Sequence, residues 1–275
     1  MFLPFVRRFP PLVLRGSYRF ASTDLVRTQV DDKTGIAVVS MNRAPVNSLN
    51  LDLLREISSA LDDVEKNKST GMILTSTAET VFSAGLDITE MYKPEQARLK
   101  EFWTTLQDVW TKLFGSSFPT AAAINGHAPA GGCLLAMSCE YRVMRPNFTI
   151  GLNETQLGIV APIWFMATME NILPRREAEL ALTLGKMFST EKAREIGLVD
   201  DVVATKEEAI AKCTDFIQLF AKVPKTARAL TKQAFRRRFL ETLDREQDLQ
   251  MFLYYTLQPQ VQKGLGLYMD RLKKK

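Results

Sequence analysis

Hydrophobic and polar positions follow two alternating patterns along the chain from Gly35 onward. Short runs of β-branched and other apolar residues predict strands, whereas apolar residues spaced three and four positions apart predict amphipathic helices. Strands separated by helices indicate right-handed βαβ units and a mainly parallel sheet. The strands are expected at residues 36–41, 72–75, 120–124 and 141–144, and the helices at 51–64, behind the N-cap residue Asn50, and at 96–114.

The β pattern fades beyond about Glu191, and the rest of the sequence carries helical periodicity. We therefore predict an α/β core over residues 31–200 and an all-helical C-terminal region over residues 201–275. No internal repeat of about 20 to 50 residues interrupts either part. The C-terminal helices are expected at residues 210–220, 227–239, 249–257 and 260–272.

The first 23 residues differ in composition from the rest of the chain, because their only charged side chains are arginines and the first acid is Asp24. Such a segment is typical of a mitochondrial transit peptide, which together with a flexible N-terminus is expected over residues 1–30; a frayed basic terminus is the alternative. The remaining basic residues nearly balance the 31 acids, so the charge does not indicate nucleic-acid binding. The four arginines are Arg7, Arg8, Arg15 and Arg19.

The apolar residues suit a large buried core rather than a membrane span. Charge, Gly or Pro interrupts every apolar run before it reaches the roughly 20 residues that cross a bilayer. The cysteines form no CxxC pair, and their odd number suits a reducing compartment, so we interpret them as small buried hydrophobic residues. They are Cys133, Cys139 and Cys213.

Two segments that contain glycine, residues 82–88 and 125–133, follow predicted strands. Glycines let the backbone approach a ligand closely, and a helix that begins near Gly131 would point free amides and its positive dipole end at the same place. For each segment alone, a tight turn or close packing is the alternative. Two N–H donors from separate loops can form an oxyanion hole, which stabilises charge on a carbonyl oxygen by about 3 to 4 kcal/mol per donor.

A third segment, residues 150–159, holds a single acid, Glu154, among apolar residues and glycines. An acid in such surroundings tends to be desolvated, which raises its pKa towards the range useful for proton transfer. A carboxylate in the first turn of a helix, facing solvent, is the alternative. The only histidine, His127, has no recognisable nucleophile or orienting acid, so we expect no chemical role for it.

The order of four motifs resembles that of the crotonase (enoyl-CoA hydratase/isomerase) superfamily. The motifs are PVNSL at 45–49, SAGLD at 83–87, PAGGC at 129–133 and GLNE at 151–154, and the resemblance extends from about residue 34 to the C-terminus. It implies an α/β fold with a crotonase-like ββα spiral core and a homotrimer in which the C-terminal helices help to form the contacts.

Within the superfamily, residues 150–159 resemble the mitochondrial Δ3,Δ2-enoyl-CoA isomerases. That resemblance implies a matrix enzyme that moves the double bond of a 3-enoyl-CoA to the 2-trans position, during β-oxidation of unsaturated fatty acids, without a metal or other cofactor. It implies that Glu154 is the catalytic base and that the Leu86 and Gly131 amides form the oxyanion hole. The implied substrate-binding residues are Ala84, Gly85, Leu86, Asp87, Ile88, Gly131 and Asn153.

One position separates this chain from the hydratase branch of the superfamily. Hydratases of this type carry a second glutamate three residues after the oxyanion glycine, where this chain has Leu134. Water addition uses two carboxylates, whereas a 1,3-proton shift needs one group that takes and returns a proton. A hydratase or another acyl-CoA enzyme of the same fold remains an alternative, and an RNA-binding member of the superfamily is an alternative of another class.

Overall fold

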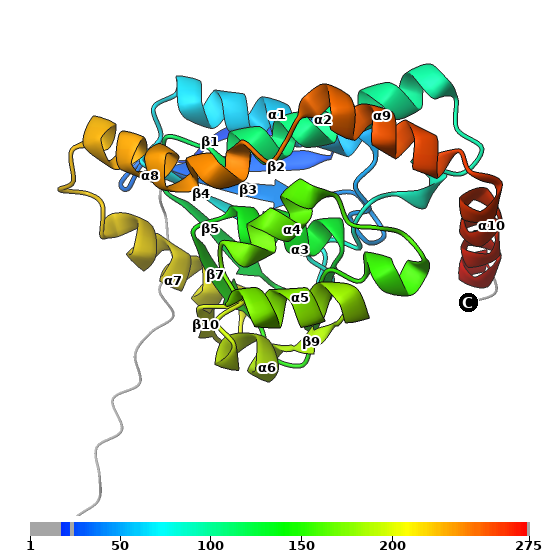
Figure 1. Ribbon diagram of the computed structural model, residues 1–275. Helices are drawn as coiled ribbons and strands as arrows, with labels where there is room; N and C mark the ends of the chain where they lie inside the picture. Colours follow the sequence, from blue (N-terminus) through cyan, green and yellow to red (C-terminus); the bar gives the residue numbers. More distant parts are fainter. Residues whose placement is uncertain (1–17, 23–24, 274–275) are drawn as a thin grey trace, which may run out of the picture.

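The computed structural model, which describes residues 18–22 and 25–273, is built around a seven-stranded mixed sheet (Figure 1). Its strands are β1 (Tyr18–Ser22), β2 (Val26–Asp31), β3 (Ile36–Met41), β4 (Gly71–Ser76), β5 (Thr120–Ile124), β7 (Tyr141–Met144) and β10 (Asp201–Val202). They lie in the order β1-β2-β3-β4-β5-β7-β10, and every pairing from β3 to β10 is parallel. The mainly parallel sheet is therefore confirmed, with β1, β2 and β3 forming an antiparallel edge.

A second, three-stranded sheet lies beside the first. It consists of β6 (Ala128–Pro129), β8 (Thr149–Gly151) and β9 (Phe188–Ser189), in the order β6-β8-β9. Strand β6 pairs with β8 in parallel, whereas β8 pairs with β9 antiparallel. Because β6 and β8 run in the same direction, the segments that follow them leave from the same edge of the sheet.

The helices match the predicted periodicity closely where they are long. Asn50 caps α1 as expected, since its side chain accepts a hydrogen bond from the Leu53 N–H at 3.0 Å. Among the described residues, no helix combines the length and apolar character needed to cross a membrane. The helices are α1 (Leu51–Lys66), α2 (Gln96–Phe114), α3 (Gly131–Ser138), α4 (Ile163–Glu170), α5 (Arg175–Leu184), α6 (Thr190–Glu195), α7 (Lys206–Gln218), α8 (Lys225–Leu240), α9 (Arg245–Thr256), α10 (Pro259–Lys273), and the short 3₁₀ helices η1 (Ile88–Glu90) and η2 (Glu154–Leu157).

Alternate residues of the strands face two different cores, as the two-residue period of a strand requires. On β4, Met72 and Leu74 lie in the larger core together with the apolar stripes of α1 and α2. Ile73, between them, faces a smaller core that contains Ala209 and Cys213 of α7. Helices therefore cover both faces of the sheet.

The α/β core of the structure extends beyond both of its expected limits, residues 31 and 200. The core begins before residue 31, because β2 pairs along its length with β3 and β1 pairs with β2. It also extends past residue 200, because β10 joins the sheet and α7 packs against it. The transit-peptide prediction for residues 1–17 and 23–24 lies outside the described residues.

Helix α8 packs on the core through charged side chains rather than through a wide apolar stripe. Arg228, Lys232 and Arg236 recur every four residues and are all buried. The Lys232 Nζ lies 3.0 Å from a carboxylate oxygen of Glu140, which Arg228 also contacts. Arg236 donates to the Ser138 carbonyl at 3.0 Å, at the C-terminal end of α3, where a cation is favoured by the helix dipole.

Candidate active site

The three segments singled out in the sequence run side by side and in the same direction. Val81 forms a parallel bridge with His127. Strand β6, which follows His127 directly, pairs in parallel with β8. Shortly after these paired stretches, the segments reach the three residues expected to act: Leu86, Gly131 and Glu154.

The peptide unit between Gly85 and Leu86 is held in one orientation by the preceding loop. The Leu49 N–H donates to the Gly85 carbonyl at 2.8 Å, and the Asp87 N–H donates to the Leu49 carbonyl at 3.0 Å. In a trans peptide, the C=O and the N–H point in opposite directions, so the Leu86 N–H points away from Leu49. It donates no hydrogen bond among the described residues. Gly85 has a φ of +85°, which favours glycine.

The same reasoning applies to Gly131, the first residue of α3. The Leu134 N–H donates to the Ala130 carbonyl at 3.0 Å, so the Gly131 N–H points out of the start of the helix. Within the part of the chain that the structure describes, this amide also has no acceptor. Ala130 has a φ of 48° and a ψ of −122°, a conformation rarely adopted by a residue with a Cβ. No sequence signal indicated this strain, because alanine shows no preference for such backbone angles.

The two free amides lie next to each other. A Cβ added to Gly131 would come within 3.4 Å of the Leu86 nitrogen, and one added to Gly85 within 3.1 Å of the Gly131 nitrogen. Side chains at either glycine would therefore crowd the space between the donors. Two unpaired N–H groups that converge from separate loops are the arrangement that an oxyanion hole requires.

Glu154, at the start of η2, is buried and its carboxyl group has no partner. The residue is 8% exposed, and neither carboxylate oxygen has a hydrogen bond within the described residues. Burial disfavours the charged form and raises the pKa of Glu154 to about 7. The solvent-facing alternative is therefore wrong, and the acid is poised to exchange protons near neutral pH.

The acid also lies close to the helix that begins at Gly131. Burial, and then the negative charge of Glu154, raises the pKa of the Cys133 thiol well above its usual value. Cys133 is in the first turn of α3, two residues after Gly131. Two observations therefore place Glu154 near the start of α3: the pairing of β6 with β8, and the effect of its charge on Cys133.

The turn that carries Glu154 is anchored to α5. The Thr155 hydroxyl donates to the Leu182 carbonyl at 2.7 Å, and the Gln156 amide donates to the Leu184 carbonyl at 3.2 Å. The sequence reasoning missed both anchors, because they join segments that are far apart in the chain. These two hydrogen bonds hold the turn in place through the side chains of the two residues that follow Glu154.

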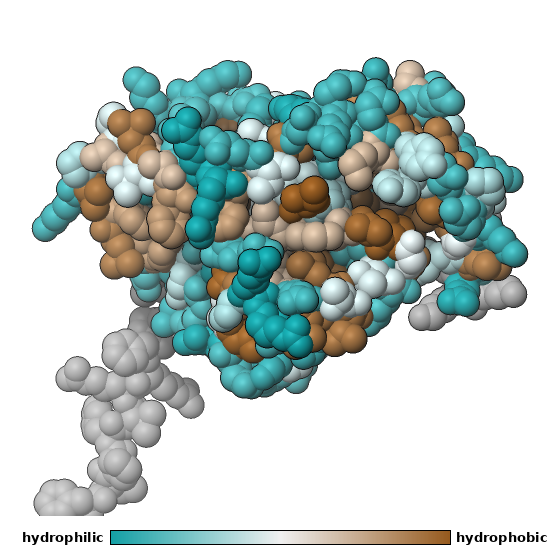
Figure 2. All heavy atoms as spheres, viewed as in Figure 1, coloured by the Kyte–Doolittle hydropathy of each residue, from teal (hydrophilic) through white to brown (hydrophobic). Residues whose placement is uncertain are grey.

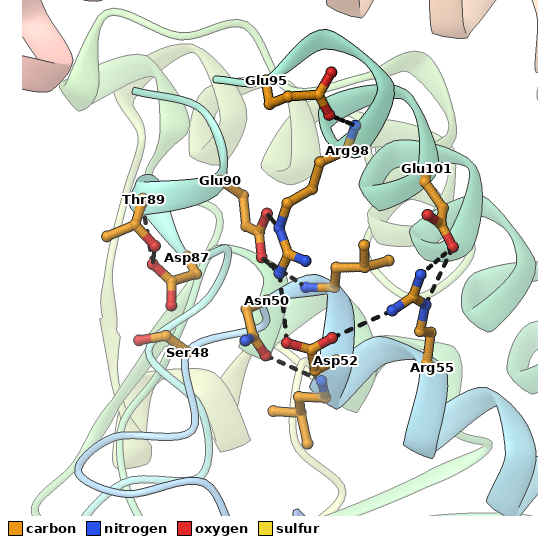
Figure 3. A network of polar contacts seen from close by, with 12 residues as sticks. Ser48, Asn50, Asp52, Arg55, Asp87, Thr89, Glu90, Glu95, Arg98 and Glu101 are labelled. Atoms are coloured by element: carbon orange, nitrogen blue, oxygen red, sulfur yellow. Dashed lines mark hydrogen bonds and ion pairs between the residues drawn. The ribbon is translucent and has the colours of Figure 1, made fainter. Parts of the chain in front are cut away.

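The other predicted residues lie around this centre. Asn153 precedes Glu154, and its buried Oδ1 has no partner among the described residues. Ala84 and Ile88 flank the Leu86 amide in sequence, and Ala84 is exposed. The Asp87 carboxylate accepts from the Thr89 N–H at 3.0 Å and so satisfies a loop amide (Figure 3).

Several residues have surroundings that do not favour a chemical role. The Nδ1 of His127 accepts from the Thr149 N–H at 3.1 Å, and its ring packs against Phe148. The three cysteines are buried and free, as expected. Leu134 is fully buried on α3. Among residues 18–22 and 25–273, no group of three or more His, Cys, Asp and Glu side chains could hold a metal ion.

Comparison with known proteins identifies the family of the chain. The family model described as enoyl-CoA hydratase/isomerase matches residues 31–275. The mitochondrial enoyl-CoA delta isomerase 1 of Mus musculus is 41% identical over 265 residues, which cover 94% of this chain and 91% of the mouse protein. The Homo sapiens protein of the same name is 41% identical, with 94% and 86% covered. A crystal structure of human mitochondrial Δ3,Δ2-enoyl-CoA isomerase matches with a TM-score of 0.87, at 41% identity, over 91% of this chain and 98% of that one. The chain therefore belongs to the enoyl-CoA hydratase/isomerase family, as its motifs suggested.

Proposed function

We propose that the protein is a Δ3,Δ2-enoyl-CoA isomerase, which converts 3-cis- and 3-trans-enoyl-CoA into 2-trans-enoyl-CoA in the β-oxidation of unsaturated fatty acids. The observation that carries the proposal is the buried, unpartnered carboxyl group of Glu154, on the segment that follows β8, together with the two free amides, since β8 pairs with the β6 strand that leads to Gly131. The similarity to relatives named as enoyl-CoA delta isomerases, over 94% of the chain, supports it.

The proposed reaction is a 1,3-proton shift through an enolate. The thioester oxygen accepts hydrogen bonds from the Leu86 and Gly131 N–H groups, which stabilise the negative charge that develops on it. The Glu154 carboxylate removes a proton from C2, and the electrons of that C–H bond delocalise into a dienolate. Glu154 then returns the proton to C4, which gives the conjugated 2-enoyl-CoA. A pKa of about 7 suits an acid that must both accept and return a proton near neutral pH.

The surrounding residues support substrate binding and exclude water in this proposal. Residues 84–88 and Asn153 line the acyl-CoA site. Leu134 stands where a hydratase of this family has a second carboxylate, so no second acid is supplied there to hold and activate water. The reaction consists of proton transfers only and therefore calls for no metal, flavin or nicotinamide.

The proposed assembly is a homotrimer in the mitochondrial matrix, reached through an N-terminal transit peptide. Apolar residues gather over α8 and across the middle of the face shown in Figure 2. Leu230 and Phe235 of α8 are 61% and 72% exposed, which is unusual for side chains of that size and suits a subunit contact. The mitochondrial names of the relatives support the location.

A direct assay tests the proposal. Purified protein is incubated with a 3-enoyl-CoA, and the conjugated-enoyl absorbance is followed without a coupling enzyme. In parallel, a 2-trans-enoyl-CoA is supplied and the formation of 3-hydroxyacyl-CoA is measured by chromatography. Isomerisation without hydration is expected, whereas hydration without isomerisation would replace the proposal with the hydratase.

Isotope transfer tests the use of a single carboxyl group. With a substrate deuterated at C2, a buried acid that moves one proton between two carbons should place part of the deuterium at C4 of the product. Mass spectrometry of the product measures that fraction. Complete exchange with solvent hydrogen at every temperature and turnover time would contradict direct return by a shielded Glu154.

A further inference from the structure

Two loops meet around the Leu86 amide and are joined along much of their length. They are residues 43–51, which lead into α1, and residues 82–90, which lead through η1. The Ser83 hydroxyl donates to the Asn47 carbonyl at 2.7 Å. Main-chain hydrogen bonds of 2.9, 2.8 and 3.0 Å join Ala84 to Val46, Leu49 to Gly85 and Asp87 to Leu49. The direction of the Leu86 N–H therefore depends on where the first loop is held.

An ion pair closes the two loops next to Leu86. The Arg43 guanidinium lies 2.9 Å from the Asp87 Oδ2, and the same guanidinium donates to the Ser48 carbonyl at 2.9 Å. The other carboxylate oxygen of Asp87 accepts from the Thr89 N–H and hydroxyl, at 3.0 and 2.6 Å. Asp87 thus uses one oxygen for each loop. Its side chain is 10% exposed and that of Arg43 is 26% exposed, so water screens this pair less than a surface pair.

The far end of η1 is held separately by Glu90, which is buried. Its Oε1 accepts from the Leu51 N–H at 3.1 Å, and Arg98 donates to both carboxylate oxygens, at 2.6 and 2.7 Å (Figure 3). These contacts fix η1 to the start of α1 and to α2. Both anchors therefore follow Leu86 in the chain, and the Arg43–Asp87 pair is the one directly adjacent to it.

We propose that Arg43 is a positioning residue for the isomerisation, because its ion pair with Asp87 keeps the Leu86 N–H aimed at the thioester oxygen. The inference rests on the proposed function. Stabilisation by an oxyanion hole depends on donors that are already oriented when charge develops. Loss of the pair should therefore destabilise the bound transition state more than the bound substrate, because contacts along the whole acyl-CoA hold the substrate.

The test compares Arg43→Met and Arg43→Lys with the wild type and with Arg55→Met. Arg55 is a matched control, because its ion pairs also join two segments but go to Asp52 and Glu101 (Figure 3). We expect Arg43→Met to lower kcat about 10-fold or more with little change in KM, since small misplacements of reacting groups can cost up to about 100-fold. Arg43→Lys should restore part of kcat, and Arg55→Met should match the wild type.

A spectroscopic measurement separates positioning from general damage. A 3-oxoacyl-CoA has an enolate that absorbs in the near ultraviolet, and a functional oxyanion hole raises the enolised fraction of the bound molecule. Arg43→Met should lose most of that absorbance at saturating ligand, while its thermal unfolding stays like that of Arg55→Met. Asp87→Asn, which keeps an oxygen for Thr89 but removes the charge, tests the same pair if Arg43→Met does not fold.

Other outcomes overturn the inference. Unchanged kcat and enolate absorbance in a folded Arg43→Met or Asp87→Asn would show that the pair does not position the amide. A raised KM with intact enolate absorbance would assign Arg43 to substrate binding instead. If the wild type neither isomerises a 3-enoyl-CoA nor enolises the bound 3-oxoacyl-CoA, the proposed function fails first and this inference falls with it.

Discussion

A glutamate lies near each end of helix α3, and the two acids have opposite surroundings: Glu154 is buried, whereas Glu140 is partly buried. Glu154 lies near its first turn, beside Cys133, and its carboxyl group has no partner among the described residues. Glu140 follows its last turn and contacts both Arg228 and Lys232 of α8. One site supports the proposed chemistry, whereas the other attaches a helix.

The pKa values of the two acids show what separates these roles. Burial raises the pKa of Glu154 to about 7, with no nearby cation to oppose it. Burial also raises the pKa of Glu140, but Lys232 and Arg228 together outweigh burial and leave the pKa below its usual value. Burial still disfavours the charged form of Lys232, because it lowers the pKa of this lysine to about 8 despite the contact with Glu140. Burial therefore raises the pKa of an acid towards neutrality only where no cation compensates for it.

The largest expected effect is a loss of activity when Glu154 is replaced. Glu154→Gln should lower kcat by about 1000-fold or more, because it removes the group that takes and returns the proton. Isomerase assays of the folded variant, checked by circular dichroism, measure this. Glu140→Gln is the matched control and should keep most of the activity at a temperature where it is folded. Similar activity losses in both variants would mean that the two acids do not differ in role.

The second prediction concerns stability. Glu140→Gln should reduce the free energy of unfolding by about 3 kcal/mol near pH 7, because it leaves buried cations unpaired. Since the pKa of Glu140 is lowered in the folded protein, its stabilising effect is present above its unfolded pKa and is lost as the pH falls. Denaturant titrations at fixed protein concentration should therefore show a difference from wild type that shrinks in acid. Glu241→Gln, which removes an exposed helical pair with Arg237, should leave stability unchanged.

The sequence pattern predicted the elements whose periodicity is strong. Helix α2 begins and ends where expected, and β3, β5 and β7 match the predicted strands. The pattern failed for β1 and β2, because the basic composition before Asp31 suggested a leader and β2 has only two apolar residues, Val26 and Val30, with three polar residues between them. It also assigned α7 to the wrong part, since periodicity shows that a helix has an apolar side but not which surface that side covers.

The site was predicted by motif order more than by physics. Local pattern left Glu154 ambiguous between a buried base and a surface acid, and only the three-dimensional structure shows that its oxygens are buried without partners. Arg43, Ala130 and Thr155 carry no local signal, because their roles arise from contacts or backbone angles that spacing does not encode. Glu140 likewise carries no local signal, because its role depends on the contact with Arg228 of α8.

The third prediction sharpens the comparison, since the two acids should change stability in opposite directions. The folded pKa of Glu154, about 7, lies above the unfolded value near 4.5, so between these values the folded state binds more protons. Stability should therefore fall as the pH rises through this window. Glu154→Gln should be more stable than wild type at pH 8 by about 2 kcal/mol, somewhat less than the pKa difference implies, because the new amide is also unpaired. The advantage should disappear near pH 4.5, and equal stability at both pH values would show that burial does not raise this pKa.

The smallest expected effect is the pH dependence of the wild-type rate. Only the ionised form of Glu154 can remove a proton, and its pKa of about 7 means that the ionised fraction falls as the pH drops below neutrality. The rate kcat/KM should therefore decrease about 10-fold between pH 8 and pH 6, following a single ionisation of the free enzyme. A glutamate paired with cations, as Glu140 is, would instead keep the rate flat through this range, because it stays ionised well below pH 6. A flat profile with full activity at pH 5 would thus mean that the base has a paired, low-pKa environment, and it would remove the physical difference on which the comparison of the two acids rests.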